Sequence, residues 1–230
     1  MFTFKRFSIL MITAVITVSA VAAQSEMTVE ESYLQHSIEI MIIRETARAS
    51  SREQKFVALG FIGDAIERGN KSDDIRQTLD YLSREGRRSV AMESGRVVNN
   101  FPDVRRESAK FLGMIGTEEA RRTLLDICLF ENEPMVLQEA ITSLGDIGTN
   151  DNNETVKIIV SVVSRFDNLN PDNLMAIATI DAFEKIAKKN NGLHSREAIE
   201  LLARISEGHY IRPVQERARQ LLADLRSYGS

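Results

Sequence analysis

The side chains that could support catalysis or metal binding are few and widely spaced in this sequence. Its three histidines, His36, His194 and His209, show no His-x-x-x-His spacing, and no paired cysteines accompany them. Cys128 is the only cysteine and lies in the apolar run 124–130. A catalytic thiol needs an activating base and some exposure, so this position predicts a small buried hydrophobic residue instead. We therefore predict no catalytic, cofactor-binding or metal-binding residue.

Carboxylates and glycines are numerous, but they do not indicate a reaction either. A pair of catalytic acids needs one carboxylate in a cleft with a raised pKa. The sequence instead places its most regular carboxylates on solvent faces or at helix starts: Asp103, Glu107, Glu118, Glu119 and Asp126. Gly60, Gly113 and Gly145 recur within one repeated phrase and are predicted near helix ends, whereas a phosphate-binding glycine loop opens a helix after a strand.

Basic side chains give the one pattern that could bind a partner. Arg122, Lys157, Arg165 and Arg204 fall on polar stripes of successive predicted helices and would lie side by side across three repeated units. Arginine-rich grooves suit acidic peptide segments, because guanidinium groups pair with carboxylates. Mixed charges on exposed helical faces also arise from ordinary solvation and from pairing within a helix. Both interpretations remain open at the level of the sequence.

A repeated phrase indicates which elements position these side chains. The pattern Leu-Gly-x-Ile-Gly occurs at 59–63, 112–116 and 144–148, and the four prolines precede helix-core positions at similar intervals: Pro102, Pro134, Pro171 and Pro213. Proline is favoured in the first turn of a helix and glycine just past its last turn, so each interval predicts one helix that ends at the glycine. A repeat of about 32 to 39 residues is typical of a helical solenoid. We predict an all-α fold, an α-solenoid (superhelix) of about four to five helical hairpins.

Capping signals place the individual helices. The predicted ranges are 29–48, 51–67, 72–84, 104–115, 117–130, 136–147, 155–166, 171–189, 195–206 and 213–226. Asn170 is the predicted N-cap of the helix whose first turn contains Pro171. The segment 87–99 is weakly helical and is interpreted as an extra helix inserted in the first unit. Gly113 and Gly145 are predicted to remove side chains where the two antiparallel helices of one unit are closest.

The run 102–116, followed by Thr117-Glu118-Glu119-Ala120 and an apolar second helix, resembles a HEAT repeat of the type first described in phycobilisome lyases. The next unit, 134–148, is similar, although Leu137 replaces the arginine that is present as Arg105 in the first. The resemblance weakens over 171–226 and before 100. It implies a scaffold whose second helices line a concave, partner-binding side. It does not imply pigment chemistry, because the name describes a repeat type.

The N-terminal segment predicts export. Lys5 and Arg6 precede an apolar run, and small residues lead to Ala23, the pattern of a secretory signal removed after that residue. The alternative is a retained membrane anchor. We therefore divide the chain into a signal peptide (1–23), an N-terminal capping helix with a divergent first repeat and inserted helix (24–100), and HEAT-like repeats with a C-terminal capping helix (101–230). The predicted location is the periplasm, with no membrane span after signal removal.

The charge balance limits the class of partner. A formal net charge of −4, which becomes more negative if Lys5 and Arg6 are removed, argues against a nucleic-acid or anionic-membrane binder. We predict a non-catalytic scaffold that binds a protein partner along its curved surface and assists assembly or regulation of a bacterial envelope complex. The alternatives are an accessory subunit of an envelope enzyme and a structural homo-oligomer. The sequence identifies neither the partner nor the oligomeric state.

Overall fold

The computed structural model describes residues 29–88, 90–167 and 171–228, and this part of the chain is almost entirely helical. Its α-helices are α1 (Val29–Arg48), α2 (Arg52–Glu67), α3 (Asp73–Ser83), α4 (Pro102–Ile115), α5 (Glu118–Phe130), α6 (Pro134–Ile147), α7 (Glu154–Asp167), α8 (Asn173–Lys189), α9 (Arg196–Glu207) and α10 (Arg212–Ser227). A 3-10 helix, η1 (Asp151–Asn153), precedes α7. The strands of the described part, β1 (Met92–Glu93) and β2 (Arg96–Val97), form one antiparallel pair. The predicted signal segment 1–23 lies outside the described residues.

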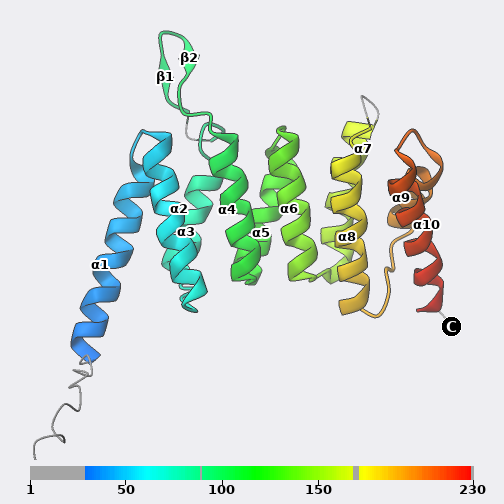
Figure 1. The fold of residues 1–230 in the computed structure, drawn as a ribbon, viewed down its shortest axis with the longest axis horizontal. Coiled ribbons are helices and arrows are strands. Elements are labelled where there is room, and N and C mark those ends of the chain that lie inside the picture. The colour runs from blue at the N-terminus through cyan, green and yellow to red at the C-terminus, as the bar shows by residue number, and fades with distance from the viewer. Residues whose placement is uncertain (1–28, 89, 168–170, 229–230) are drawn as a thin grey trace, which may run out of the picture. The chain divides into compact units, whose positions relative to one another are not determined.

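The contacts divide the chain into two units, Met1–Ile38 and Glu39–Ser230. In the second unit, helices stand side by side in two layers (Figure 1). The first-helix layer contains α2, α4, α6, α8 and α10, and the second-helix layer contains α3, α5, α7 and α9. Successive helices alternate between the layers, so α2–α3, α4–α5, α6–α7 and α8–α9 are hairpins and α10 follows the last one. This arrangement confirms the predicted α-solenoid of four to five hairpins.

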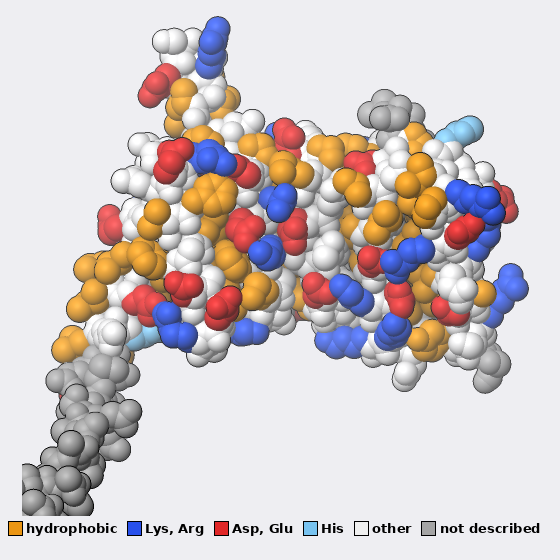
Figure 2. Space-filling model, in the orientation of Figure 1, with side chains coloured by type: hydrophobic (Ala, Val, Ile, Leu, Met, Phe, Trp, Pro, Cys, Tyr) orange, Lys and Arg blue, Asp and Glu red, His pale blue; other side chains and the backbone are white. Residues whose placement is uncertain are grey.

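A continuous core lies between the layers of the second unit. Four side chains of α4 and α5 form one buried level of this core, and four of α6 and α7 form the next: Leu112, Ile115, Leu124 and Cys128, then Leu144, Ile147, Ile159 and Val163. The outer face of the first-helix layer mixes hydrophobic side chains with charges of both signs (Figure 2). In the described part of the chain, no helix has both the length and the apolarity that crossing a bilayer requires.

The predicted positions of proline and glycine are confirmed in α4, α6 and α10 and are wrong in α2 and α8. Pro102, Pro134 and Pro213 lie in first turns as predicted, and Gly116 and Gly148 end α4 and α6 with φ of 73° and 69°. Two predictions are wrong. Gly63 lies inside α2, which continues for another turn, so the first copy of the repeated phrase does not end a helix. Pro171 precedes α8, whose N-cap is Asp172 and not Asn170, because the Asp172 side chain accepts hydrogen bonds from the amides of Leu174 and Met175.

The glycines inside the central helices serve a different contact from the predicted one. A Cβ placed on Gly113 would lie 2.6 Å from the side chain of Ser143, and one on Gly145 would lie 2.6 Å from Cα of Ala182. Ser143 and Ala182 belong to the first helices of the following repeats. The close approach is therefore between first helices of successive repeats, not between the two helices of one repeat. Glycine is required there because any side chain would separate the two backbones.

This geometry predicts opposite effects for one substitution at two glycines. Gly145→Ala should lower the free energy of unfolding by about 1–3 kcal/mol, because the new methyl group overlaps the backbone of α8. Gly60→Ala should raise it by roughly 0.5–1 kcal/mol, because Gly60 lies mid-helix in α2 with open space around it and alanine favours the helix. Urea denaturation followed by circular dichroism measures both. Equal effects at the two positions would contradict the assigned contact.

The predicted inserted helix over 87–99 is wrong, and a β-hairpin occupies this segment. Ser94 and Gly95 have φ of 49° and 78°, and two consecutive left-handed residues between paired strands form the tight turn that matches strand twist. Gly86, with φ of 70°, turns the chain at the base, where a Cβ would overlap the carbonyl oxygen of Asn99. The left-handed residues at both positions prevent a continuous helix through the segment.

Candidate functional site

The four basic residues of the predicted ladder lie on the second-helix layer at two different levels. Arg122 and Lys157 occupy the first two turns of α5 and α7, whereas Arg165 and Arg204 lie toward the C-terminal ends of α7 and α9. Lys157 and Arg165 are eight residues apart, which corresponds to roughly 12 Å along a helix. Arg122 is exposed and pairs with Glu118 of its own helix at 3.1 Å. The structure thus gives two pairs instead of one row.

Contacts between neighbouring repeats join the C-terminal members of the set. The Nη2 atom of Arg165 donates a hydrogen bond of 3.1 Å to the carbonyl oxygen of Glu131, at the end of α5. Its guanidinium also lies 5.3 Å from the ring centroid of Phe166. Arg204 Nη2 donates to Oγ of Ser164, the residue before Arg165, at 2.9 Å. The C-terminal ends of α5, α7 and α9 therefore lie along one edge of the layer.

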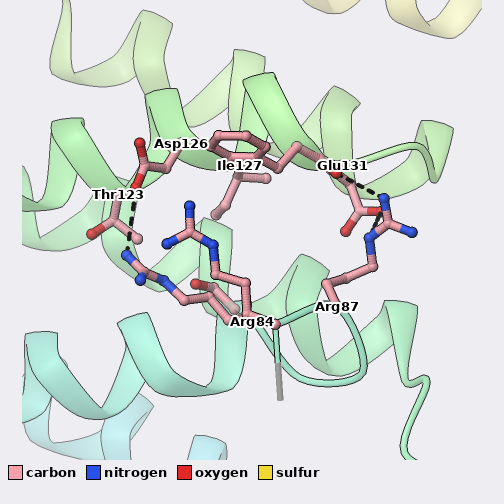
Figure 3. A pocket seen from close by; sticks show the side chains of 9 residues that line it. Arg84, Arg87, Thr123, Asp126, Ile127 and Glu131 are labelled. Atoms are coloured by element: carbon pink, nitrogen blue, oxygen red, sulfur yellow. Dashed lines mark hydrogen bonds and ion pairs between the residues drawn. The ribbon is translucent and has the colours of Figure 1, made fainter. Parts of the chain in front are cut away.

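The same edge continues to a small pocket between the end of α3 and α5 (Figure 3). We call it the arginine pocket, and it is lined by Ser83, Arg84, Arg87, Arg88, Thr123, Asp126, Ile127, Phe130 and Glu131. Its volume of about 30 Å³ has room for only a few water molecules, so it suits a single side-chain group better than a whole small molecule. Three arginines from one turn of chain surround an apolar floor.

Arg84 is already paired within the pocket. Its Nη2 atom lies 2.7 Å from Oδ1 of Asp80, one turn earlier in the chain, and 3.5 Å from Oδ2 of Asp126 on α5. Thr123 Oγ1 donates a hydrogen bond of 3.1 Å to the same Asp80 oxygen. These contacts fasten α3 to α5, so Arg84 acts mainly in packing the two repeats together.

Arg87 and Arg88 differ in the polar contacts that their guanidinium groups make. Arg87 Nη2 donates a 2.7 Å hydrogen bond to the carbonyl oxygen of Phe130, and its Nε lies 3.7 Å from Oε1 of Glu131. The guanidinium of Arg88 lies 4.9 Å from the Phe130 ring centroid, and in the described part of the chain Arg88 makes no ion pair. Phe130 itself is 58% exposed. An accessible cation beside an accessible aromatic ring is thus the part of the pocket open to a partner.

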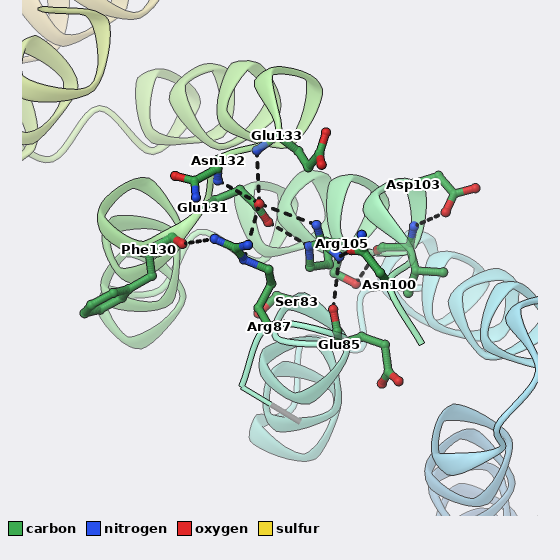
Figure 4. Close-up of polar contacts among 12 residues, drawn as sticks. Ser83, Glu85, Arg87, Asn100, Asp103, Arg105, Phe130, Glu131, Asn132 and Glu133 are labelled. Carbon is green, nitrogen blue, oxygen red and sulfur yellow. Dashed lines mark hydrogen bonds and ion pairs between the residues drawn. The ribbon is translucent and has the colours of Figure 1, made fainter. Parts of the chain in front are cut away.

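A buried ion pair lies beneath the pocket (Figure 4). Arg105 is fully buried in α4, and its Nε donates to Oε2 of Glu131 at 2.7 Å. Its Nη1 donates to the backbone carbonyl of Glu85 at 3.0 Å and to Oδ1 of Asn100 at 2.9 Å. One guanidinium therefore joins the ends of α3, α4 and α5.

Glu131 is the centre of this network. Burial acts to raise the pKa of its carboxyl group, but the hydrogen bond from Arg105 and those from the amides of Asn132 and Glu133 outweigh burial and lower the pKa below its ordinary value. The carboxylate therefore remains ionised near neutral pH. Because the same group also lies beside Arg87, it fixes that side chain at the rim of the arginine pocket.

A second buried pair fixes the base of the β-hairpin. Lys55 Nζ lies 3.0 Å from Oε2 of Glu85 and donates to the carbonyl oxygen of Ala47 at 3.0 Å. Asn99 Nδ2 donates to the other Glu85 oxygen at 2.8 Å, and Asn99 Oδ1 accepts from the amide of Ala91 at 2.8 Å. Lys55 and Glu85 are almost completely buried. The hairpin is therefore connected to α2 through paired charges.

Comparison with known proteins agrees with this architecture. Residues 96–164 match the family model for HEAT repeats. This segment of the chain therefore has the sequence pattern of HEAT repeats. The matched segment includes β2, α4, α5 and α6 with most of α7, and it therefore includes the α5 wall of the arginine pocket. The resemblance expected from the run 102–148 is confirmed at this level.

A solved structure has a similar fold. It is the complex of CpcE and CpcF of phycocyanin lyase from Nostoc sp. PCC7120, with a TM-score of 0.55 and 17% sequence identity over 83% of this chain and 67% of that chain. At this identity the similarity concerns the fold alone. A search of curated proteins found no match.

Cys128 of α5 lies in the hydrophobic core of the second unit. Burial raises the pKa of its thiol to about 12, and Arg165 offsets only part of that effect. Its sulfur is therefore protonated at neutral pH and shielded from solvent. No group of three histidine, cysteine, aspartate or glutamate side chains is placed to hold a metal in residues 29–88, 90–167 and 171–228.

The thiol predicts a simple probe of native packing. At pH 8 the native protein should react with a thiol reagent on the order of 10³-fold more slowly than the unfolded chain, because a pKa near 12 leaves so little thiolate. Absorbance after addition of Ellman's reagent, with and without guanidinium chloride, measures the two rates. Cys128 is the only cysteine, so the signal has one source. Rapid labelling of the native protein would contradict its burial.

Sequence reasoning missed the arginine pocket and the network below it. Arg87 and Arg88 lie in the segment interpreted as an inserted helix, which hid their position at the end of α3. A signal was available in the sequence Arg84-Glu85-Gly86-Arg87-Arg88, because a glycine between cations is typical of a helix C-terminus. Arg105 was visible in the repeat motif, but nothing local identifies Glu131 as its partner.

Proposed function

We propose that this protein is an exported, non-catalytic HEAT-repeat scaffold that binds an acidic segment of a protein partner on its second-helix layer. The binding surface is the C-terminal arginine row, which we define as Arg87, Arg88, Arg165 and Arg204. The observation that carries the proposal is the exposed pair of Arg88 and Phe130 at the mouth of the arginine pocket. A carboxylate can pair with the guanidinium while an apolar neighbour covers the ring.

The alternative explanation of this row is structural. Cations are stabilised at helix C-termini by the helix dipole, and Arg87 and Arg165 hydrogen-bond to carbonyl oxygens at the end of α5. Arg88 and Arg204 make weaker contacts within the protein: Arg88 contacts the Phe130 ring, and Arg204 donates to the hydroxyl of Ser164. The row thus combines two cations that hold the edge together with two that keep most of their charge for a partner.

The proposed export of the protein rests on its N-terminal segment. Residues 1–23 have the basic start, apolar run and small-residue end of a secretory signal. On this basis we place the protein in the periplasm, where it would assist assembly or regulation of an envelope complex. A negative chain with an arginine-rich edge suits recognition of an acidic protein segment better than binding of nucleic acid, which favours a basic face.

A second candidate function is that of an accessory subunit of an enzyme. The similar solved structure is described as a complex of two chains of phycocyanin lyase, so a related fold takes part in an enzyme there. Under this hypothesis the partner of the arginine row is an enzyme or another of its subunits. Identification of the partner separates the two functions.

Charge reversal at the two levels tests the proposed surface. In cells expressing the full chain, Arg88→Glu with Arg204→Glu should reduce partner recovery after crosslinking and affinity isolation by about tenfold or more, since both favourable pairs become repulsive. Arg122→Glu with Lys157→Glu is the matched control, on the same layer but at the other level, and should change recovery little. Circular dichroism should show unchanged helicity for both variants.

The outcomes distinguish the two levels. Loss of recovery only in the control variant would transfer the binding surface to Arg122 and Lys157. Retained recovery in both variants would remove the basic residues of this layer from partner binding.

A further inference from the structure

The β-hairpin between α3 and α4 is the feature of the second unit that the solenoid does not require. It projects beyond the ends of the neighbouring helices (Figure 1), and Figure 2 shows hydrophobic and charged side chains along it. Met92 pairs with Val97 and Glu93 with Arg96, and Ser94-Gly95 forms the tip. A two-stranded hairpin of this length is marginally stable in water unless something packs on it.

The hairpin presents one apolar face. Side chains alternate along strands, so Met92 and Val97 share a face with Val90, two residues earlier, whereas Glu93 and Arg96 lie on the opposite face. Val90, Met92 and Val97 are 48%, 59% and 45% exposed. Nothing in the repeats needs three large hydrophobic side chains at this position. Burying them offers roughly 25 cal/mol for each Å² of apolar surface removed from water.

The base of the hairpin is fixed although its apolar face is uncovered. Asn99 joins the amide of Ala91 to the buried Glu85 carboxylate, and the amide of Val98 donates to the Ala91 carbonyl at 3.0 Å. Gly86 lies in contact with the backbone of Asn99. The direction of the hairpin is therefore set by buried contacts of the second unit. A surface held in one orientation loses little conformational entropy when it binds.

The groups next to the hairpin indicate which kind of partner covers its apolar face. Each strand has two residues, so pairing of two copies through their hairpins would bury far less than the roughly 1,200 Å² of a stable interface. The net charge of −4 disfavours an anionic lipid surface. In contrast, Arg87 and Arg88 line the arginine pocket and lie a few residues before β1, so the base of the hairpin begins next to that pocket.

We propose that the hairpin is the second part of the partner-binding surface, and that its apolar face packs on an apolar patch of the partner next to the acidic segment held by the arginine row. This inference rests on the proposed function. It defines the chemistry of the partner: carboxylates bordering exposed hydrophobic side chains, at a separation that one hairpin spans. The arginines steer and orient the partner, and the hairpin supplies the apolar contact.

Site-specific photocrosslinking in intact cells tests the proposal. The probe is p-benzoylphenylalanine, placed in the full chain at position 97 on the apolar face, at position 96 on the opposite face of the same strand, or at position 130, where it replaces the exposed phenylalanine of the arginine pocket. We expect positions 97 and 130 to crosslink to the same polypeptide, identified by mass spectrometry, and position 96 to crosslink little. Titration of that purified polypeptide should then show about tenfold or weaker binding to the M92S/V97S variant, with an unchanged thermal midpoint.

The other outcomes overturn the inference or the proposed function as follows. An adduct at position 130 with none at 97 excludes the hairpin from the binding surface and leaves the proposed function. A dimer of this chain or a lipid adduct at 97 assigns the apolar face to another occupant and overturns the inference. Equal crosslinking at 96 and 97 contradicts the assigned binding face. No adduct at either 130 or 97 overturns both this inference and the proposed function.

Discussion

Replacing Glu131 by alanine should lower the free energy of unfolding by about 3–5 kcal/mol, because Arg105 then remains as a buried charge without its carboxylate. Arg105 is fully buried and Glu131 is 3% exposed, and the two form a hydrogen-bonded ion pair of 2.7 Å. The loss includes the hydrogen bonds that Glu131 accepts from the amides of Asn132 and Glu133. Urea denaturation of wild type and variant at pH 7, followed by circular dichroism, gives the difference.

Two controls separate the buried charge from other effects. Glu133→Ala removes a neighbouring carboxylate whose side chain makes no cap hydrogen bond, and it should change stability by less than about 1 kcal/mol. Arg105→Met combined with Glu131→Gln removes both charges and should recover much of the loss, since the cost comes mainly from leaving one charge unpaired. A loss below 1 kcal/mol for Glu131→Ala would show that solvent or another group compensates Arg105.

The same pair predicts a pH dependence with a definite sign. The pKa of Glu131 is lower in the folded protein than its ordinary value, so the ionised carboxylate favours folding above the unfolded pKa of about 4.3. This contribution is lost as the pH falls through the folded pKa. The stability difference between wild type and Glu131→Gln should therefore be largest near neutral pH and shrink below pH about 4. A difference that stays constant down to pH 3 would contradict the pairing.

The repeats were predictable because their signals are local. Pro102 and Gly116 mark the two ends of α4 within one stretch of chain, and the apolar spacing between them sets the buried face. The hairpin also has a local signal, the dipeptide Ser94-Gly95, but the valines around it are compatible with the weak helix that the sequence analysis predicts. The error shows that a turn dipeptide outweighs weak apolar periodicity.

The buried network was not predictable, because its partners are distant in sequence. Lys55 in α2 pairs with Glu85, which follows α3, and Arg105 in α4 pairs with Glu131, which follows α5. Each of these residues alone is typical of a solvated surface position. The predicted ladder does not form a single row for a different reason. Lys157 and Arg165 are eight residues apart on one helix, α7, so they share a face but lie at different levels.

Replacing Leu112 by alanine should lower the free energy of unfolding by about 2–5 kcal/mol. Leu112 is fully buried, and α4 packs against α2, α3, α5 and α6, so the cavity lies where two hairpins meet. For a chain of this size, each kcal/mol corresponds to a fall in the melting midpoint of about 2–4 °C. A thermal melt followed by circular dichroism measures the shift. Met114→Ala, two residues further along α4 at a 40% exposed position, is the matched control and should shift the midpoint little.

The number of transitions in that melt tests whether the repeats unfold together. In a stack where each repeat buries its apolar face on its neighbours, weakening one interface destabilises the repeats on both sides. Because α4 connects the first hairpin to the rest of the second unit, Leu112→Ala should shift one cooperative transition and not create an early partial one. A separate low-temperature step in the variant would mean that the repeats on either side of α4 fold independently. An unchanged midpoint would exclude the core position assigned to Leu112.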